Sequence, residues 1–190
     1  MRIKDEVKQE AIIKATIKLV NKIGFVSSSV AKIAKEANVS PATIYIYYKN
    51  KEDLLVSTYI DIKLKLSEAL LKNFDDSKPF RDILLNFWKN GFDFVANNKE
   101  LYMYAEQFSN SPYSEVVNHK ELEKHFEPMI RVLQNGIDQK VIKDVPFDIL
   151  AAFIFYPIMI MSNSKICRTL ELNKKNIEAG FQLAWDAIKL

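Results

Sequence analysis

The chain of 190 residues contains little of several residue types, and each shortage excludes a class of structure. A single cysteine, Cys167, excludes an internal disulfide and is typical of a protein from a reducing cytoplasm. Four glycines and six prolines leave few residues for the turns of a sheet or for disordered segments. The longest apolar run, residues 149–161, is shorter than the roughly 20 residues that cross a bilayer. The composition therefore predicts a cytoplasmic protein without a membrane anchor.

The sequence also lacks the motifs of catalytic sites. It has no glycine-rich phosphate loop, no nucleophile elbow and no cysteine-rich metal motif. The charged amino terminus, MRIKDEVKQEA, lacks the apolar segment of a secretory signal. We therefore expect a binding protein rather than an enzyme, and nominate no catalytic residue, no metal ligand and no cofactor.

Positive charge is concentrated in the first quarter of the chain. Residues 1–53 contain ten Lys/Arg and six Asp/Glu, whereas residues 54–190 contain seventeen and eighteen. The net charges are therefore +4 and −1, which sum to the +3 of the whole chain. A basic amino-terminal module is typical of a protein that binds a polyanion such as DNA.

Residues 27–55 predict two short helices around a tight turn, followed by the start of a longer helix. The first helix has an apolar stripe at i, i+3, i+4 and i+7, which runs from Val30 to Ala37. A hydroxyl at Ser28 or Ser29 would begin it, and Asn38 tolerates the left-handed backbone that often ends a helix. Together these signals predict a helical hairpin.

The second helix is expected to begin with Ser40 as its cap and Pro41 at its first position. Its inner side would carry Ile44 and Tyr48, while Ile46 would lie on the opposite, outer side. An outward apolar residue suits a face that enters the major groove, where thymine methyl groups are available. The pattern indicates a helix-turn-helix, although a purely structural hairpin is the alternative. Side chains suited to phosphate contacts surround the outer side: Thr43, Tyr45, Tyr47, Lys49 and Lys51.

The run VSPATIYIYYKNKEDLL, preceded by SSSVAKIAKEA, resembles the amino-terminal signature of TetR-family transcriptional regulators. The resemblance covers about residues 8–55; the rest of the chain is similar to the family only in its helical organisation. Three positions depart from the family pattern. Ala31 stands where many members carry a basic residue, Asn38 replaces the usual glycine, and Pro41-Ala42 replaces a common lysine-glycine pair.

Carried over by position, the resemblance implies two groups of DNA-contacting residues. The phosphate-binding group is Ser28, Ser29, Thr43, Tyr47 and Lys51, to which the residue pattern adds Lys49. The group nearest the bases is Pro41, Ala42, Tyr45 and Ile46.

The whole chain is expected to be all-α, with a DNA-binding domain over residues 1–50 and a carboxy-terminal domain over residues 51–190. Because no flexible linker interrupts the helix expected from residue 50, that helix could carry movement to the recognition helix. Pro128 should bend or divide one of the later helices. Helices are expected over residues 4–23, 50–73, 79–97, 99–108, 114–140, 146–168 and 174–189.

Residues 80–161 are crowded with aromatic and methionine side chains. An apolar pocket and the core of a helical bundle use the same residue types, so the pattern alone fits both. The TetR resemblance implies a cavity here that binds a small-molecule inducer. Its predicted lining residues are Trp88, Phe92, Tyr102 and Tyr156.

The last two expected helices are candidates for a dimer interface. The helix over 146–168 is apolar nearly all round and must be covered by other groups. The resemblance implies that it and the helix over 174–189 pair with their counterparts in a four-helix bundle. The alternative is that the first of them is the central element of a monomer's core.

The sequence thus predicts a homodimer that binds a pseudopalindromic DNA operator and represses transcription until a small, largely apolar ligand releases it. Two other interpretations stay open. One is a DNA-binding architectural or cell-division factor of the same fold that has no inducer. The other is a helical lipid- or small-molecule-binding protein, or an enzyme, in which the hairpin is structural.

Overall fold

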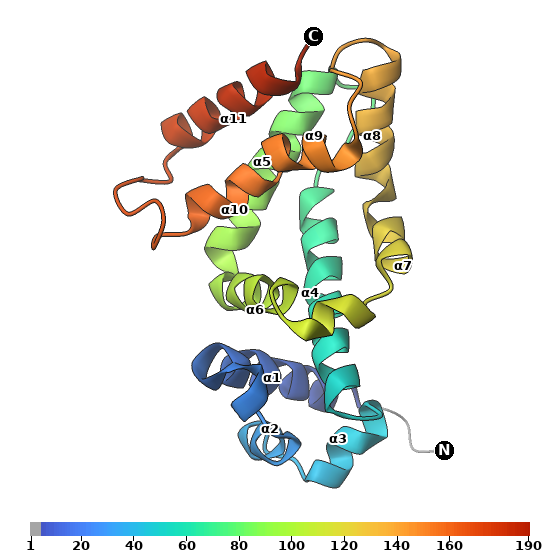
Figure 1. The fold of residues 1–190 in the computed structure, drawn as a ribbon, viewed down its shortest axis with the longest axis vertical. Helices are drawn as coiled ribbons and strands as arrows, with labels where there is room; N and C mark the ends of the chain where they lie inside the picture. The colour runs from blue at the N-terminus through green and yellow to red at the C-terminus, as the bar shows by residue number, and fades with distance from the viewer. Residues whose placement is uncertain (1–4) are drawn as a thin grey trace. The chain divides into compact units, whose positions relative to one another are not determined.

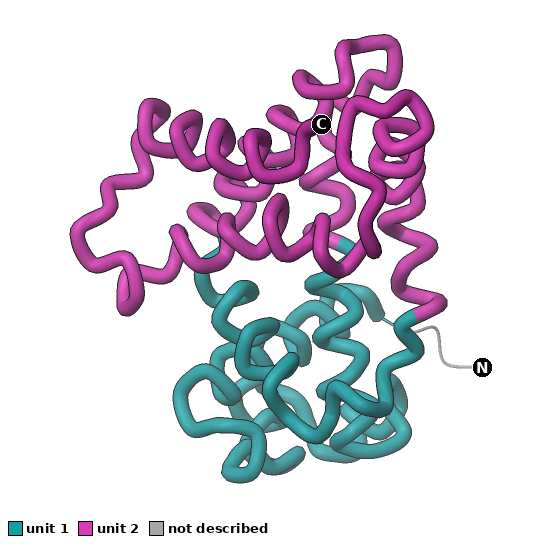
Figure 2. Tube along the Cα trace, turned by 45° about the horizontal axis from the view of Figure 1, so that its top comes forward, with its two compact units in different colours: residues 1–64, 98–119 teal, residues 65–97, 120–190 magenta. Residues whose placement is uncertain are grey.

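The computed structural model describes residues 5–190, which form helices and connecting loops (Figure 1). Among these residues there is no strand, and Ile142 and Lys189 form an isolated antiparallel bridge. The chain divides into two compact units, coloured separately in Figure 2. Unit 1 contains residues up to 64 and residues 98–119, and unit 2 contains residues 65–97 and 120–190. The predicted all-α fold class is confirmed.

Unit 1 contains the predicted helix-turn-helix. The predicted start of the first helix at residue 4 lies outside the described residues. The elements of unit 1 are α1 (Glu6–Ser27), α2 (Val30–Glu36), α3 (Pro41–Tyr47), the first part of α4 (Lys51–Leu70), α6 (Lys99–Ser109) and the 3₁₀ turn η1 (Pro112–Val116).

Local signals set the ends of the short helices. Ser29 caps α2 by accepting from the Lys32 N–H, and Ser40 caps α3 by accepting from the Thr43 N–H at 3.1 Å. Asn38 has a φ of 53°, the left-handed conformation predicted for the turn. Gly24, with a φ of 76° and a ψ of 169°, interrupts the helical backbone near the end of α1 in a conformation that glycine adopts readily. The predicted caps of the two short helices and the left-handed turn at Asn38 are confirmed.

A compact apolar core holds the first four helices together. Because the apolar residues of each helix recur at helical spacing, each helix buries one side in this core. The buried residues of the core are Ile12 and Ala15 of α1, Ile33 and Ala34 of α2, Ile44 of α3, Tyr48, and Leu54 of α4.

Helix α6 belongs to unit 1 through contacts with α1 and α4. The Asn21 side-chain amide donates to the Glu100 carbonyl at 2.9 Å and accepts from the Gln107 amide at 3.0 Å. The buried Tyr104 hydroxyl donates to the Leu55 carbonyl at 2.9 Å. The Phe25 ring packs edge-on against the Tyr104 ring, with centroids 5.5 Å apart. The compact units therefore do not divide at residue 50, and that limit of the DNA-binding domain stays a prediction.

Unit 2 contains the remaining helices. Its elements, after the end of α4, are α5 (Phe80–Asn97), α7 (His119–Glu123), the 3₁₀ turn η2 (Lys124–Phe126), α8 (Glu127–Asp138), α9 (Phe147–Ile154), α10 (Tyr156–Ser162) and α11 (Lys174–Ile188).

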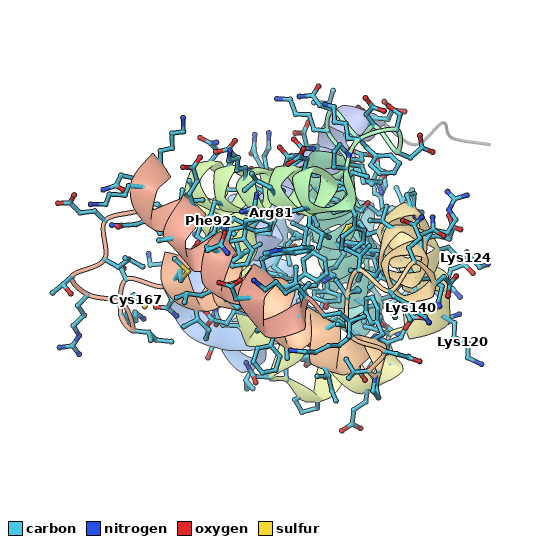
Figure 3. All side chains as sticks on the ribbon, turned by 90° about the horizontal axis from the view of Figure 1, so that it is seen from above. Arg81, Phe92, Lys120, Lys124, Lys140 and Cys167 are labelled. Carbon is cyan, nitrogen blue, oxygen red and sulfur yellow. The ribbon has the colours of Figure 1, made fainter. Side chains whose placement is uncertain are left out.

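Two predicted helices are divided in the structure. Pro128 divides the helix predicted over 114–140 as expected. Residues 112–126 form only short elements, the two 3₁₀ turns and the five-residue helix α7, from which Lys120 and Lys124 project (Figure 3). The unbroken helix predicted over 146–168 is wrong. It ends at Ile154 and restarts at Tyr156, because Pro157 has no N–H to donate and clashes with the preceding turn. It also stops at Ser162, and Cys167 lies in the following loop (Figure 3).

The core of unit 2 joins α5 to α11. Trp88 of α5 is fully buried, and its indole N–H donates to the Ile177 carbonyl at 3.0 Å. Its ring also lies 5.6 Å from the Phe92 ring and 5.8 Å from the Phe181 ring, centroid to centroid. Arg81, labelled with Phe92 in Figure 3, places its guanidinium 5.2 Å from the centre of the Phe181 ring. Within residues 5–190, no helix has both the length and the apolar character needed to cross a bilayer.

Candidate DNA-binding surface

Helix α3 presents two chemically different sides. Ile44 and Tyr48 are buried in the core of unit 1, with 1% and 4% of their surfaces exposed. Ala42, Tyr45 and Ile46 are exposed, Tyr45 by 56% and Ile46 by 44%. The predicted inner and outer sides are therefore confirmed, and α3 carries an uncovered face of small and medium apolar groups.

The amino-terminal end of α3 is fixed by two hydroxyl groups. The Ser40 hydroxyl oxygen accepts from the Thr43 N–H and lies 2.9 Å from the Thr43 hydroxyl oxygen. Thr43 is half-buried beside exposed Pro41. The first turn of α3, including the neighbouring Ala42, is therefore held in place by its own cap.

Tyr47 connects the end of α3 to the start of α1. Its hydroxyl accepts from the Asp5 N–H at 3.0 Å and donates to the Asp5 carbonyl at 3.1 Å. The Asp5 carboxylate accepts from the Val7 and Lys8 N–H groups and so caps α1 at the same point. These bonds fix the position of α3, and the predicted contact of Tyr47 with a phosphate stays a prediction.

Lys51 has a similar structural role. Its ammonium donates to the Phe25 carbonyl at 2.6 Å and lies 3.5 Å from the Val26 carbonyl, both in the last turn of α1. Burial lowers the pKa of this ammonium group. Lys49 differs because its side chain is exposed, while its main-chain N–H donates to the Asp53 carboxylate at 2.7 Å. Of these two predicted phosphate-binding lysines, Lys49 is the one at the surface.

The two serines before α2 have different surroundings. Ser28 is fully buried, and its hydroxyl donates to the Gly24 carbonyl at 2.7 Å. Ser29 is exposed at the amino-terminal end of α2. The Ser28 side chain therefore closes the bend at Gly24, whereas the Ser29 side chain is accessible, and the predicted contacts of the two serines with a phosphate stay predictions.

Basic side chains that the prediction omitted lie on the neighbouring helices. Lys32 and Lys35 are exposed on α2, and the Lys32 ammonium donates to the Ser27 carbonyl at 3.0 Å. Lys18 of α1 is paired with Glu36 of α2, and its ammonium holds the pKa of the Glu36 carboxylate below the ordinary value. The sequence could have indicated Lys32 and Lys35, because both lie outside the apolar stripe of the first helix of the hairpin and would therefore be exposed.

The four residues predicted to line a ligand cavity do not form one cluster within either unit. Trp88 and Phe92 are buried and pack against each other in unit 2. Tyr156 also belongs to unit 2 but is 56% exposed on α10. Tyr102 lies on α6, which belongs to unit 1. The cavity and its lining stay predictions.

The last three helices leave large apolar side chains exposed in unit 2. Such side chains on helices are typical of a surface that another protein covers. The predicted dimer interface falls on these helices and stays a prediction. The exposed residues are Phe147, Ile149, Phe153, Tyr156, Ile160 and Leu183.

Comparison with protein families matches both parts of the chain. Residues 12–58 match the family described as "Bacterial regulatory proteins, tetR family". Residues 79–189, more than half of the chain, match "Tetracyclin repressor-like, C-terminal domain". Both families describe transcriptional regulators rather than enzymes.

Individual proteins give the same result. The crystal structure of a TetR family transcription regulator from Marinobacter aquaeolei VT8 is 34% identical, covers 100% of this chain and 99% of that chain, and has a TM-score of 0.90. An uncharacterized HTH-type transcriptional regulator from Haemophilus influenzae is 36% identical over 103 residues, so the match spans 54% of this chain and 55% of that relative. The structure of FadR from Bacillus subtilis, in complex with stearoyl-CoA, is 22% identical, covers 93% of this chain and 95% of that chain, and has a TM-score of 0.71. At that identity the FadR match shows the fold alone. The chain belongs to the TetR family of bacterial transcriptional regulators.

Proposed function

We propose that this regulator is a homodimeric repressor that binds a pseudopalindromic DNA operator and leaves it when a small, largely apolar ligand binds. The observation that carries the DNA-binding part is the exposed face of α3, which is held in place from both ends. Ser40 fixes its first turn, and Tyr47 fixes its last turn to the main chain of Asp5. A recognition helix needs such a fixed position because base contacts depend on its register in the groove.

The exposure of each side chain decides which part of the DNA we expect it to contact. The exposed residues of α3 are proposed to contact the bases: Pro41, Ala42, Tyr45 and Ile46. We assign phosphates to the exposed Ser29 and Lys49 and to Thr43 at the edge of the same face. Ser28, Tyr47 and Lys51 act as positioning residues, because their polar atoms bond to the main chain of unit 1.

A homodimer would supply the second recognition helix. Two-fold symmetric dimers of helix-turn-helix proteins bind half-sites about one helical turn apart or a multiple of it. We place the interface on the exposed apolar residues of α9, α10 and α11. A regulator that binds chromosomal DNA would act in the cytoplasm.

The ligand is proposed to bind within residues 51–190 and to favour a dimer whose recognition helices are wrongly spaced for the operator. It shifts this equilibrium only by its different affinities for the two conformations. The aromatic and apolar side chains around α5 favour an apolar ligand. Because FadR of Bacillus subtilis shares the fold and was crystallised with stearoyl-CoA, long-chain acyl-CoA is the first class to test.

Selection of bound sites from random duplex DNA tests the operator. We expect a pseudopalindrome with two spaced half-sites. No enrichment at low salt, with a folded dimer confirmed by sedimentation, would exclude operator binding.

A second experiment tests the ligand. Stearoyl-CoA, stearate and free CoA would be added separately to the complex with the selected operator. Release by stearoyl-CoA alone supports an acyl-CoA ligand. Release by stearate as well would show that the protein recognises the fatty acyl group without CoA. If none of the three releases the operator, a long-chain acyl ligand is excluded, and the ligand belongs to another class.

A further inference from the structure

The exposed face of α3 lacks the side chains that make the strongest base contacts. Hydrogen bonds to guanine come mainly from Arg or Lys, and those to adenine come mainly from Asn or Gln. The sequence of α3, PATIYIY, contains none of these four residue types. Hydrogen bonding from α3 to base edges would therefore depend on hydroxyl groups.

Most hydroxyl groups of α3 are engaged within the protein. The Thr43 hydroxyl lies 2.9 Å from the Ser40 hydroxyl, in the cap of the helix, and is assigned above to a phosphate at the edge of the exposed face. The Tyr47 hydroxyl both donates to and accepts from the main chain of Asp5. Among the hydroxyl-bearing residues of α3, this leaves Tyr45, which lies beside Ile46 on the exposed face.

The groups that α3 does expose are apolar and regularly spaced. Ala42 and Ile46 are both exposed and are four residues apart, so they lie on the same side of the helix. Four residues correspond to a rise of about 6 Å along the helix. This is close to two base-pair steps of about 3.4 Å each. In the major groove, the matching apolar group is the 5-methyl group of thymine.

We propose that Ala42 and Ile46 each contact the 5-methyl group of a thymine in every half-site, at positions about two base-pair steps apart. The inference deepens the proposed function and rests on it. It states that the central bases of the operator are recognised by shape and apolar contact. Since 5-methylcytosine carries a methyl group at the same place, this contact accepts 5-methylcytosine as well as thymine.

Deoxyuridine provides the test, because it keeps the base pairing and hydrogen-bonding groups of thymidine and lacks only the methyl group. Each thymidine of the selected operator would be replaced in turn, symmetrically in both half-sites, and the affinity measured by fluorescence anisotropy. We expect two sensitive positions in each half-site. Each lost methyl contact should weaken binding about fourfold, which corresponds to about 0.8 kcal/mol for a buried methyl-sized group. The symmetric replacement should therefore weaken binding about 15-fold.

A double-mutant cycle assigns the contact to its residue. Ile46→Ala should remove the sensitivity to deoxyuridine at one of the two positions and keep it at the other. Val116→Ala is the matched control, because Val116 is exposed on η1, outside the helix-turn-helix. It should keep both sensitive positions. Thermal unfolding of both variants confirms that they fold.

The failure of this inference and the failure of operator binding give different results. Tight binding of the selected operator with equal affinity for thymidine and deoxyuridine at every position overturns methyl recognition and leaves operator binding standing. If Ile46→Ala keeps the sensitivity to deoxyuridine at both positions, Ile46 does not contact either methyl group. Absence of any selected site overturns both proposals. Placed symmetrically at a sensitive position in both half-sites, 5-methylcytosine·guanine should bind about 15-fold more tightly than cytosine·guanine, and equal affinity for the two would also contradict the inference.

Discussion

Both compact units expose apolar side chains, but the two surfaces differ in size and setting. On α3 the exposed groups are few, and hydroxyls and lysines surround them. On α9, α10 and α11 they are large and include Phe147, Phe153 and Tyr156. Protein–DNA interfaces are more polar and more positively charged than protein–protein interfaces, whereas obligate dimer interfaces are the most apolar. The difference fits the proposal that α3 binds DNA and that α9, α10 and α11 form the interface of a dimer.

The largest effect is expected when a charge is placed on the exposed apolar surface of α9, α10 and α11. Phe153→Asp should convert the dimer to a monomer, because the carboxylate would lose its water at an apolar interface. Operator affinity should fall by about 100-fold or more, since a monomer loses the gain from two linked half-site contacts. Sedimentation velocity and operator titration measure the two effects.

The control for this variant is Val116→Asp, which places the same charge at an exposed apolar residue of unit 1. It should stay dimeric and bind the operator normally. If the Phe153→Asp protein sediments as a dimer, α9 is not part of the dimer interface.

The second prediction distinguishes the roles of Lys49 and Lys51, which the sequence analysis both expects to contact phosphates. Lys51→Met should lower the free energy of unfolding by about 1.5 kcal/mol, because the ammonium donates to the Phe25 and Val26 carbonyls. Lys49→Met should change it by less than about 0.5 kcal/mol. Instead, Lys49→Met should reduce the slope of log affinity against log salt by about 1 for each protomer.

Urea unfolding and salt titrations of both variants measure these effects. If Lys51→Met keeps full stability and loses only salt dependence, Lys51 is a phosphate contact and its positioning role is wrong.

The third prediction concerns Tyr47. Tyr47→Phe removes the hydroxyl that bonds to Asp5 and should cost about 1 kcal/mol of stability. Since α3 is then held less firmly and base contacts depend on its register, affinity for the operator should fall more than affinity for a scrambled duplex. An equal loss for the two duplexes would show that Tyr47 contacts a phosphate instead.

The smallest effect on DNA recognition is expected in the turn before α3. Asn38 has a φ of 53°, so Asn38→Ala should cost about 1 kcal/mol, whereas Asn38→Gly should be nearly neutral in stability. Neither change should alter base preference, because Asn38 lies outside α3. Thermal unfolding and a repeated site selection check both points, and a changed selected motif would assign Asn38 to the reading surface.

The helix-turn-helix was predictable because its signals are local. Ser40, Pro41 and Asn38 act on main-chain atoms within a few residues, so their positions in the sequence are sufficient to place α3 and its turn. The roles of Tyr47 and Lys51 were not predictable in the same way. Their partners are main-chain atoms 42 and 26 positions away, and their residue types suit phosphates equally well.

The carboxy-terminal part was predicted less well for a related reason. Apolar character over residues 146–168 indicates burial but does not fix helix ends, and it obscured the effect of Pro157. The sequence also did not show that Tyr102 lies in unit 1. Its helix joins unit 1 through the distant contacts of Asn21 and Phe25, which no sequence periodicity reveals.

The composition of unit 1 has a practical consequence for hybrid regulators. A chimera joined near residue 50 would combine α1 to α3 of one parent with α6 of another. It would then place a foreign residue opposite Asn21 and foreign rings against Phe25. Exchange of operator specificity between family members should therefore transfer residues 98–119 together with the amino-terminal helices, or retain from one parent the side chains that join α1 to α6.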